Sequence, residues 1–147
     1  MADRMRHEQA SPAVQKRVQD SFDLQGLMSH LGARINHIGP GRVHIVLPAR
    51  PAVTQQHGYI HAGAVSAGGC AALTLFDEES EVLTVEYEIN LFAPAADDHL
   101  EAIGTVLKPG RTLTVCRLEA NGLQTDGVRE LVANGQQALI RVNRTAG

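Results

Sequence analysis

The stretch QQHGYIHAGAVSAGGCAALTLF, residues 55–76, decides the fold. It contains a polar turn, a histidine and then a run of small and apolar residues. The run from residue 62 to residue 76 is long enough for a buried helix and ends at the acidic stretch DEESE. Gly68 and Gly69 stand in its middle, although glycine is the worst ordinary helix former. The stretch predicts a helix with His61 at its start and leaves its two glycines to be explained.

Runs with strand character lie on both sides of this helix. Residues 33–38 and 42–47 are separated by GPG and predict a hairpin, since Val43, Ile45 and Leu47 alternate with polar residues. Later runs of the same kind predict four more strands, at 83–91, 100–107, 111–120 and 130–142. A helix with several antiparallel strands is an α+β plan, in which one face of the sheet packs on the helix.

The chain has 147 residues, which suits a single domain. Residues 1–19 are polar and are expected to fray or to form a loose helix, so the domain is predicted to span residues 20–147. It opens with a short amphipathic helix that Asp20 or Ser21 caps and Gly32 closes.

Composition excludes several classes of function. Hydrophobic residues make up 44% and charged residues 20%, as in ordinary soluble proteins. The net charge of −3 offers no broad basic surface for nucleic acid. Cys70 and Cys116 form no CxxC pair, and the seven histidines form no metal-ligand motif, so no metal is expected. The N-terminus has no apolar core of a signal peptide, and no run could span a bilayer, which predicts a cytoplasmic protein without a membrane partner.

Three segments in this order resemble one family. QQHGYIHAG, then VLTVEYEINLFAPA, then KPGRTLTVC are similar to the PaaI branch of the hotdog-fold acyl-CoA thioesterases, over about residues 22–142. The resemblance implies a curled antiparallel sheet wrapped around a central helix, a homodimer or homotetramer, and hydrolysis of acyl-CoA thioesters. It implies no cofactor, because coenzyme A is part of the substrate.

The resemblance also assigns roles around the start of the helix. A helix start exposes unpaired N–H groups, which can hold the thioester oxygen as negative charge develops on it. The backbone N–H of Ala62 or Gly63 would form this oxyanion hole, His61 would orient the turn, and Gln55 would position the nucleophile or the water. Ala62 stands where glycine is common in the family, but its backbone donor remains. Gln56 fits the spacing less well and is expected to be solvated.

The segment KPGR, residues 108–111, lies between two predicted strands and has two interpretations. It can be an ordinary hairpin turn with exposed charges. In the related family the corresponding turn lies near the mouth of the site, where Lys108, Gly110 and Arg111 would bind the phosphates of coenzyme A. Both interpretations stay open at the level of sequence.

The sequence departs from the family at its catalytic acid. The family carries Asp or Glu nine residues after the motif histidine, whereas this chain has Cys70 there and no acid between His61 and Asp77. The chain is also about four or five residues shorter in this part, so the simplest alignment places a gap near Ala67 and Gly68. Either the protein lacks this turn of helix, or its intact form carries residues that this sequence omits. Loss of five residues would rotate the rest of the helix by ~140°, which favours the second explanation.

Other acids are poor substitutes for the missing one. Asp77, Glu78, Glu79 and Glu81 follow the helix, far from its start. Glu86 and Glu88 lie on the polar face of their strand and are expected to face water or a partner subunit.

Two main functions remain at this stage. The first is acyl-CoA thioester hydrolysis, and the second is a binding module that keeps the coenzyme A groove without the acid. A hotdog-fold hydratase is disfavoured, because no Asp and His pair has suitable spacing. The low aromatic content of 3% favours aliphatic over aryl acyl groups.

Overall fold

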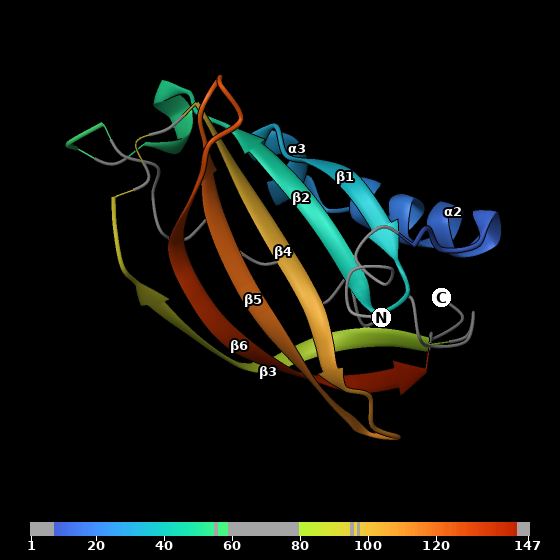
Figure 1. Ribbon diagram of the computed structural model, residues 1–147. Helices are drawn as coiled ribbons and strands as arrows, with labels where there is room; N and C mark the ends of the chain where they lie inside the picture. The colour runs from blue at the N-terminus through green and yellow to red at the C-terminus, as the bar shows by residue number, and fades with distance from the viewer. Residues whose placement is uncertain (1–7, 55, 59–79, 95, 97, 144–147) are drawn as a thin grey trace.

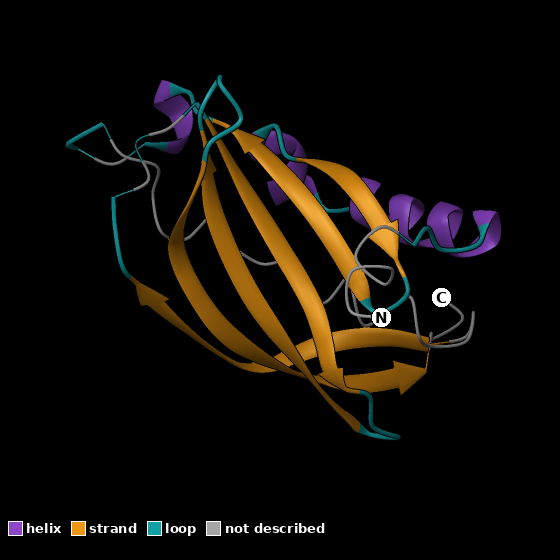
Figure 2. Cartoon of the chain, viewed as in Figure 1, coloured by secondary structure: helices purple, strands orange, loops and turns teal. Residues whose placement is uncertain are grey.

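The computed structural model describes residues 8–54, 56–58, 80–94, 96 and 98–143 (Figure 1). Its described strands form one antiparallel sheet of six, in the order β1-β2-β4-β5-β6-β3. The strands are β1 (Arg34–Gly39), β2 (Arg42–Pro48), β3 (Ser80–Leu91), β4 (His99–Lys108), β5 (Leu113–Leu123) and β6 (Arg129–Asn143). The sheet curls strongly along its length (Figure 2).

All six strands were predicted from the alternation of apolar and polar residues, with ends that differ by a few residues. The hairpin of β1 and β2 is confirmed, and Gly41 takes the positive φ of 66° in its turn, a conformation that glycine adopts without steric cost. The predicted helix at residues 62–76 lies outside the described residues. The curled antiparallel sheet of the predicted fold class is confirmed.

Strand register separates the sheet into two faces. Val43, Ile45 and Leu47 of β2 stand beside Gly104, Ala102 and Leu100 of β4, and most of these side chains belong to the buried core. We call this side the core face. Arg42, His44 and Thr105 lie on the opposite side, which we call the outer face.

The N-terminal helix begins earlier than predicted. Helix α2 spans Pro12–Asp23, Ser11 caps it by accepting a hydrogen bond from the Val14 N–H, and Pro12 occupies its first turn. A start at Asp20 or Ser21 is therefore wrong, as is a frayed or loose conformation for residues 12–19. The physical reason is the spacing of Val14, Val18 and Phe22, which gives an otherwise polar segment one apolar stripe.

A second short helix follows after a break. Helix α3 spans Gly26–Leu31, and Gly32 ends it in the left-handed conformation with φ of 71°, as predicted. The 3-10 helix η1 spans Pro51–Val53. None of the helices in the described part of the chain is both long and apolar enough to cross a membrane.

Helix α2 is anchored to the sheet edge at β1 (Figure 1). Val18 and Phe22 are buried in the same core cluster as Ile38 and Val43. The Ala10 N–H donates to the Ile38 carbonyl at 2.9 Å, which ties the segment before α2 to β1. Residues 12–19 are thus part of the packed structure.

Candidate functional site

Four of the predicted site residues lie outside the described residues. These are Gln55, His61, Ala62 and Gly63, and the same holds for Cys70 and for the acids Asp77, Glu78 and Glu79. Gln56, which was expected to be solvated, is exposed. The structure therefore describes two parts of the predicted site. These are the residues next to Gln55 and the turn at residues 108–112.

The turn between β4 and β5 presents two cations to solvent. Lys108 ends β4 beside an irregularity in the pairing with β5, and both Lys108 and Arg111 are exposed. Neither forms an ion pair with another residue in the described part of the chain. Two free cations on a tight turn suit an anionic ligand, although such turns are also common without one.

Gly110 shapes this turn. Its N–H donates to the Thr114 hydroxyl at 3.3 Å, and Thr114 is buried. A Cβ atom at Gly110 would lie 1.9 Å from the Leu113 carbonyl oxygen, so the turn closes only around glycine. The need for glycine at position 110 therefore has a steric basis, and the predicted role of Gly110 in substrate binding stays a prediction.

The turn and the described residues next to Gln55 lie at opposite ends of the sheet (Figure 1). Pro48 of β2 is paired with His99 at the start of β4, and the Ala49 N–H donates to the Asp98 carbonyl, which places the chain that leads to Gln56 at that end. Lys108 stands at the other end of β4. Ten strand residues span about 30 Å, so the fold does not bring Lys108 or Arg111 close to residues 56–58 of the same chain.

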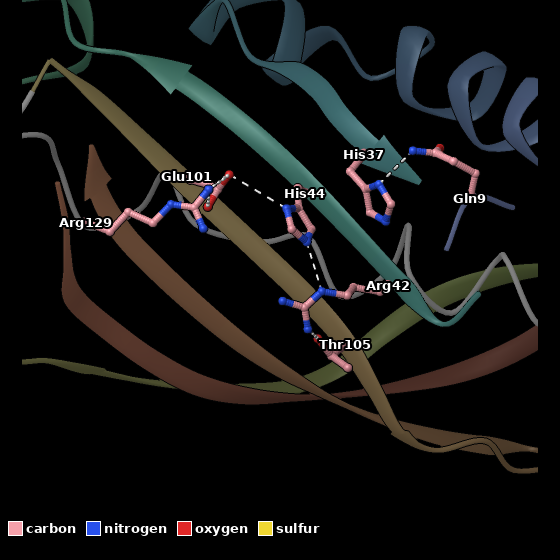
Figure 3. A network of polar contacts seen from close by, with 7 residues as sticks. All are labelled: Gln9, His37, Arg42, His44, Glu101, Thr105 and Arg129. Carbon is pink, nitrogen blue, oxygen red and sulfur yellow. Dashed lines mark hydrogen bonds and ion pairs between the residues drawn. The ribbon is translucent and has the colours of Figure 1, made fainter. Parts of the chain in front are cut away.

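A buried carboxylate on the outer face was not identified from the sequence. Glu101 of β4 is 1% exposed, and its carboxylate lies between Arg129 of β6 and His44 of β2 (Figure 3). The Arg129 Nη2 atom is 3.3 Å from Oε1 and 3.4 Å from Oε2. Burying a carboxylate is costly unless it is paired, and Arg129 supplies the cation.

The hydrogen bond that His44 accepts fixes its tautomer. The Arg42 Nε–H donates to His44 Nε2 at 2.9 Å, so the proton of the neutral ring is on Nδ1, which faces Glu101 Oε2 at 3.7 Å. The Arg42 Nη1 atom also donates to the Thr105 hydroxyl at 3.0 Å. The network therefore links β2, β4 and β6 through polar side chains.

The network keeps Glu101 ionised. The Nδ1–H of His44, which points at the carboxylate, is the largest cause that lowers the pKa of Glu101; Arg129 and Arg42 lower it further through their positive charges, while burial opposes them. A carboxylate held in this way is a weak general base. We conclude that the network stabilises the sheet. A sequence signal for it existed, since a single acid stands between Leu100 and Ala102 in an apolar run.

Comparison with known structures identifies the family. A thioesterase family protein from Silicibacter pomeroyi is 41% identical, with a TM-score of 0.85 over 89% of this chain and 99% of that one. The chain belongs to the thioesterase family. A thioesterase from Haemophilus influenzae, 20% identical, shares the fold with a TM-score of 0.73 over 86% of this chain and 88% of its own. The hotdog fold is thereby confirmed.

A curated relative of this thioesterase-family chain comes from Saccharolobus solfataricus. It is named for a proposed esterase activity and is 29% identical over 98 residues, which cover 63% of this chain and 69% of that protein. No protein-family model matches the chain. The family assignment rests on the Silicibacter pomeroyi structure.

The remaining acids of this thioesterase-family chain do not gather at a catalytic site in the described residues. Glu81 lies at the start of β3 near α2, where it lines a hollow with Lys16 and Asp20. Glu86 and Glu88 are exposed on the outer face, as expected from their alternation. Among the residues that the structure describes, no three His, Cys, Asp or Glu side chains are arranged to hold a metal ion.

Proposed function

We propose that this protein hydrolyses acyl-CoA thioesters to a free acid and coenzyme A, as a thioesterase of the PaaI type. The observation that carries the proposal is the likeness to the Silicibacter pomeroyi thioesterase family protein, since 41% identity extends over 99% of that chain. The resemblance of the segment around Gln55 and His61 to the PaaI branch supports acyl-CoA as the class of substrate.

The proposed chemistry takes place at the start of the helix expected at residues 62–76. Water attacks the carbonyl carbon of the thioester, and the backbone N–H of Ala62 or Gly63 stabilises the oxyanion. Gln55 positions the water and His61 orients the turn. The bond between carbon and sulfur then breaks, and coenzyme A leaves as a thiolate that takes up a proton. In the related family an Asp or Glu accepts the proton of water. This sequence carries no acid between His61 and Asp77, so the proposal takes that acid from a turn of helix that the sequence omits near Ala67 and Gly68.

The proposed enzyme acts as a homodimer or a homotetramer. Lys108 and Arg111 stand at the end of the sheet opposite residues 56–58. If these cations contact a ligand that is held near Gln55, they must therefore come from a second chain. Strand β3 ends the sheet order, and Leu83, Val85 and Leu91 on it are more than half exposed. A strand edge with apolar side chains is suited to pairing with a second copy.

A panel of acyl-CoA esters tests the proposal. The purified protein is incubated with short, medium and long aliphatic acyl-CoA and with one aryl acyl-CoA, and the released thiol is measured with a chromogenic thiol reagent. We expect turnover that is highest for aliphatic chains. Absence of thiol release from every ester would refute the proposal.

The second candidate is a binding module, which keeps the coenzyme A groove without the acid if the turn of helix near Ala67 and Gly68 is truly absent. Calorimetry with the same acyl-CoA esters distinguishes the two. Binding of the ester without thiol release over hours indicates the module, whereas thiol release indicates the enzyme.

A further inference from the structure

Residues 49–54 carry the chain from β2 to Gln55. They lie outside the six strands, and the 3-10 helix η1 (Pro51–Val53) stands in their middle. Strand residues are held by the hydrogen bonds of the sheet, whereas a connection of this kind is held by individual contacts. These contacts therefore set the place at which the connection delivers Gln55.

Two contacts hold the connection to the sheet. The Ala49 N–H donates to the Asp98 carbonyl at 2.8 Å. Val53 is buried and belongs to the same core cluster as Leu47 of β2. Within η1 the Val53 N–H donates to the Arg50 carbonyl at 3.0 Å, so the backbone of Arg50 is coupled to the buried Val53.

The Arg50 side chain makes a third contact, with the end of α3. Its Nη2 atom donates to the His30 carbonyl in the last turn of that helix. The last carbonyls of a helix have no partner within the helix. The backbone N–H groups just after α3 satisfy those of Met28 and Ser29, at 3.0 and 3.1 Å, and Arg50 provides the donor for the next one. The connection and α3 are thus joined through one side chain.

Gly32 leaves room for this contact. A Cβ atom at Gly32 would lie 3.3 Å from Cζ and Nη2 of Arg50, so the guanidinium packs directly against the glycine that ends α3. A positive charge at this place is also favoured by the partial negative charge of a helix end. Arg50 itself is exposed, so its replacement removes the contact with α3 and leaves the core intact.

We propose that Arg50 is a positioning residue for Gln55. It fixes η1 between the sheet and α3, and Gln55 follows η1 after a single residue, Thr54, whose hydroxyl donates to the Pro51 carbonyl at 3.0 Å. A shift of η1 therefore reaches Gln55 almost undiminished. The inference rests on the proposed function, in which Gln55 positions the attacking water, and a misplacement of about 1 Å in such a group costs roughly a hundredfold in rate.

A purely stabilising role of Arg50 predicts a different result. In that case loss of the contact lowers the thermal midpoint and leaves each folded molecule fully active. A positioning role lowers kcat of the folded enzyme and leaves KM nearly unchanged, because binding of the ester does not depend on the placement of the water. It also has no further effect once the Gln55 side chain is removed, which is specific to action through Gln55.

Thiol release from an aliphatic acyl-CoA tests the role of Arg50. We expect Arg50→Ala to lower kcat by about tenfold or more, with KM within about twofold of the wild type and an equal thermal midpoint. Arg50→Lys keeps a donor and a positive charge, so its kcat should stay within about threefold of the wild type. In a Gln55→Ala background, Arg50→Ala should cause no further loss. Arg34→Ala is the matched control with unchanged kcat, since Arg34 is also exposed and lies two residues after Gly32.

Hydrogen exchange of the peptide that covers residues 49–58 gives a second readout, which does not need turnover. Exchange should be faster in Arg50→Ala than in the wild type and unchanged in Arg34→Ala. The proposal is overturned by a wild-type kcat in Arg50→Ala, by an equal loss in Arg50→Lys, by a further loss of the same size in the Gln55→Ala background, or by unchanged exchange. If the wild type releases no thiol, the proposed function fails, and exchange alone then decides whether Arg50 holds the connection.

Discussion

The carboxylate of Glu101 lies 3.3 Å from the guanidinium of Arg129, although Glu101 is 1% exposed and Arg129 is 56% exposed. Arg129 therefore covers the acid and neutralises it while its own side chain stays in contact with water. The pair joins β4 to β6 across β5, which lies between them in the sheet. The pair lies near one end of the outer face, and the exposed side chains of Leu113 and Arg117 lie toward the other end.

Replacement Arg129→Ala should destabilise the protein by about 1–3 kcal/mol, because Glu101 then lacks its main cation and is partly desolvated. Urea unfolding followed by circular dichroism measures the free energy of unfolding. Lys16→Ala, which removes the exposed pair of Lys16 with Asp20, is the control and should have little effect. Equal effects in the two variants would contradict the account of Glu101.

The stability of the protein should fall in acid partly through Glu101. Its pKa is lowered in the folded protein from the ordinary value of 4.5, so the unfolded chain binds a proton more readily. The contribution of Glu101 to stability is fully present above pH 4.5, and it is lost as the pH falls through the lower pKa of the folded state. Urea unfolding from pH 7 to pH 3 should therefore show a smaller loss of stability for Glu101→Gln than for the wild type. Parallel curves would show that Glu101 does not contribute.

Helix α2 should be required for full stability. Phe22 is 5% exposed in the core cluster, and Phe22→Ala should cost about 3–5 kcal/mol. Leu24, two residues later, is 88% exposed, and Leu24→Ala should change the free energy of unfolding by less than about 0.5 kcal/mol. A small effect of Phe22→Ala would mean that α2 is not docked on β1 in solution.

The thiol of Cys116 should resist modification in the native protein. Burial raises its pKa to about 12, and the thiolate is the reactive form. In a Cys70→Ala variant, which leaves Cys116 as the single cysteine, a chromogenic thiol reagent should react only as the protein unfolds and at once in urea. Rapid reaction of the native variant would show that β5 opens readily.

The strands were predictable because their signal is local. In β5, residues from Cys116 to Ala120 alternate between buried and more exposed positions, and the sequence alternates between apolar and charged residues in step. Antiparallel neighbours joined by tight turns, such as β1 and β2, also follow from sequence. Strand order did not follow, because the pairing of β3 with β6 joins segments far apart in the chain.

The start of α2 and the pairing of Glu101 were missed for different reasons. In α2, Val14 and Val18 are the main apolar positions in a polar segment, so the stripe was too sparse to distinguish from a loose helix. For Glu101, the acid was visible in an apolar run, but its partners His44 and Arg129 lie on other strands. Contacts between distant strands depend on register, which one sequence does not specify.

The central claim is that the segment around Gln55 and His61 hydrolyses acyl-CoA. The most direct measurement is the rate of thiol release from one aliphatic acyl-CoA by the wild type, Gln55→Ala and the matched neighbour Gln56→Ala. The account predicts turnover by the wild type and by Gln56→Ala, and a loss of at least a hundredfold in Gln55→Ala, as for other groups that act on the reacting atoms. Equal rates in Gln55→Ala and the wild type, or no release by the wild type, would contradict it.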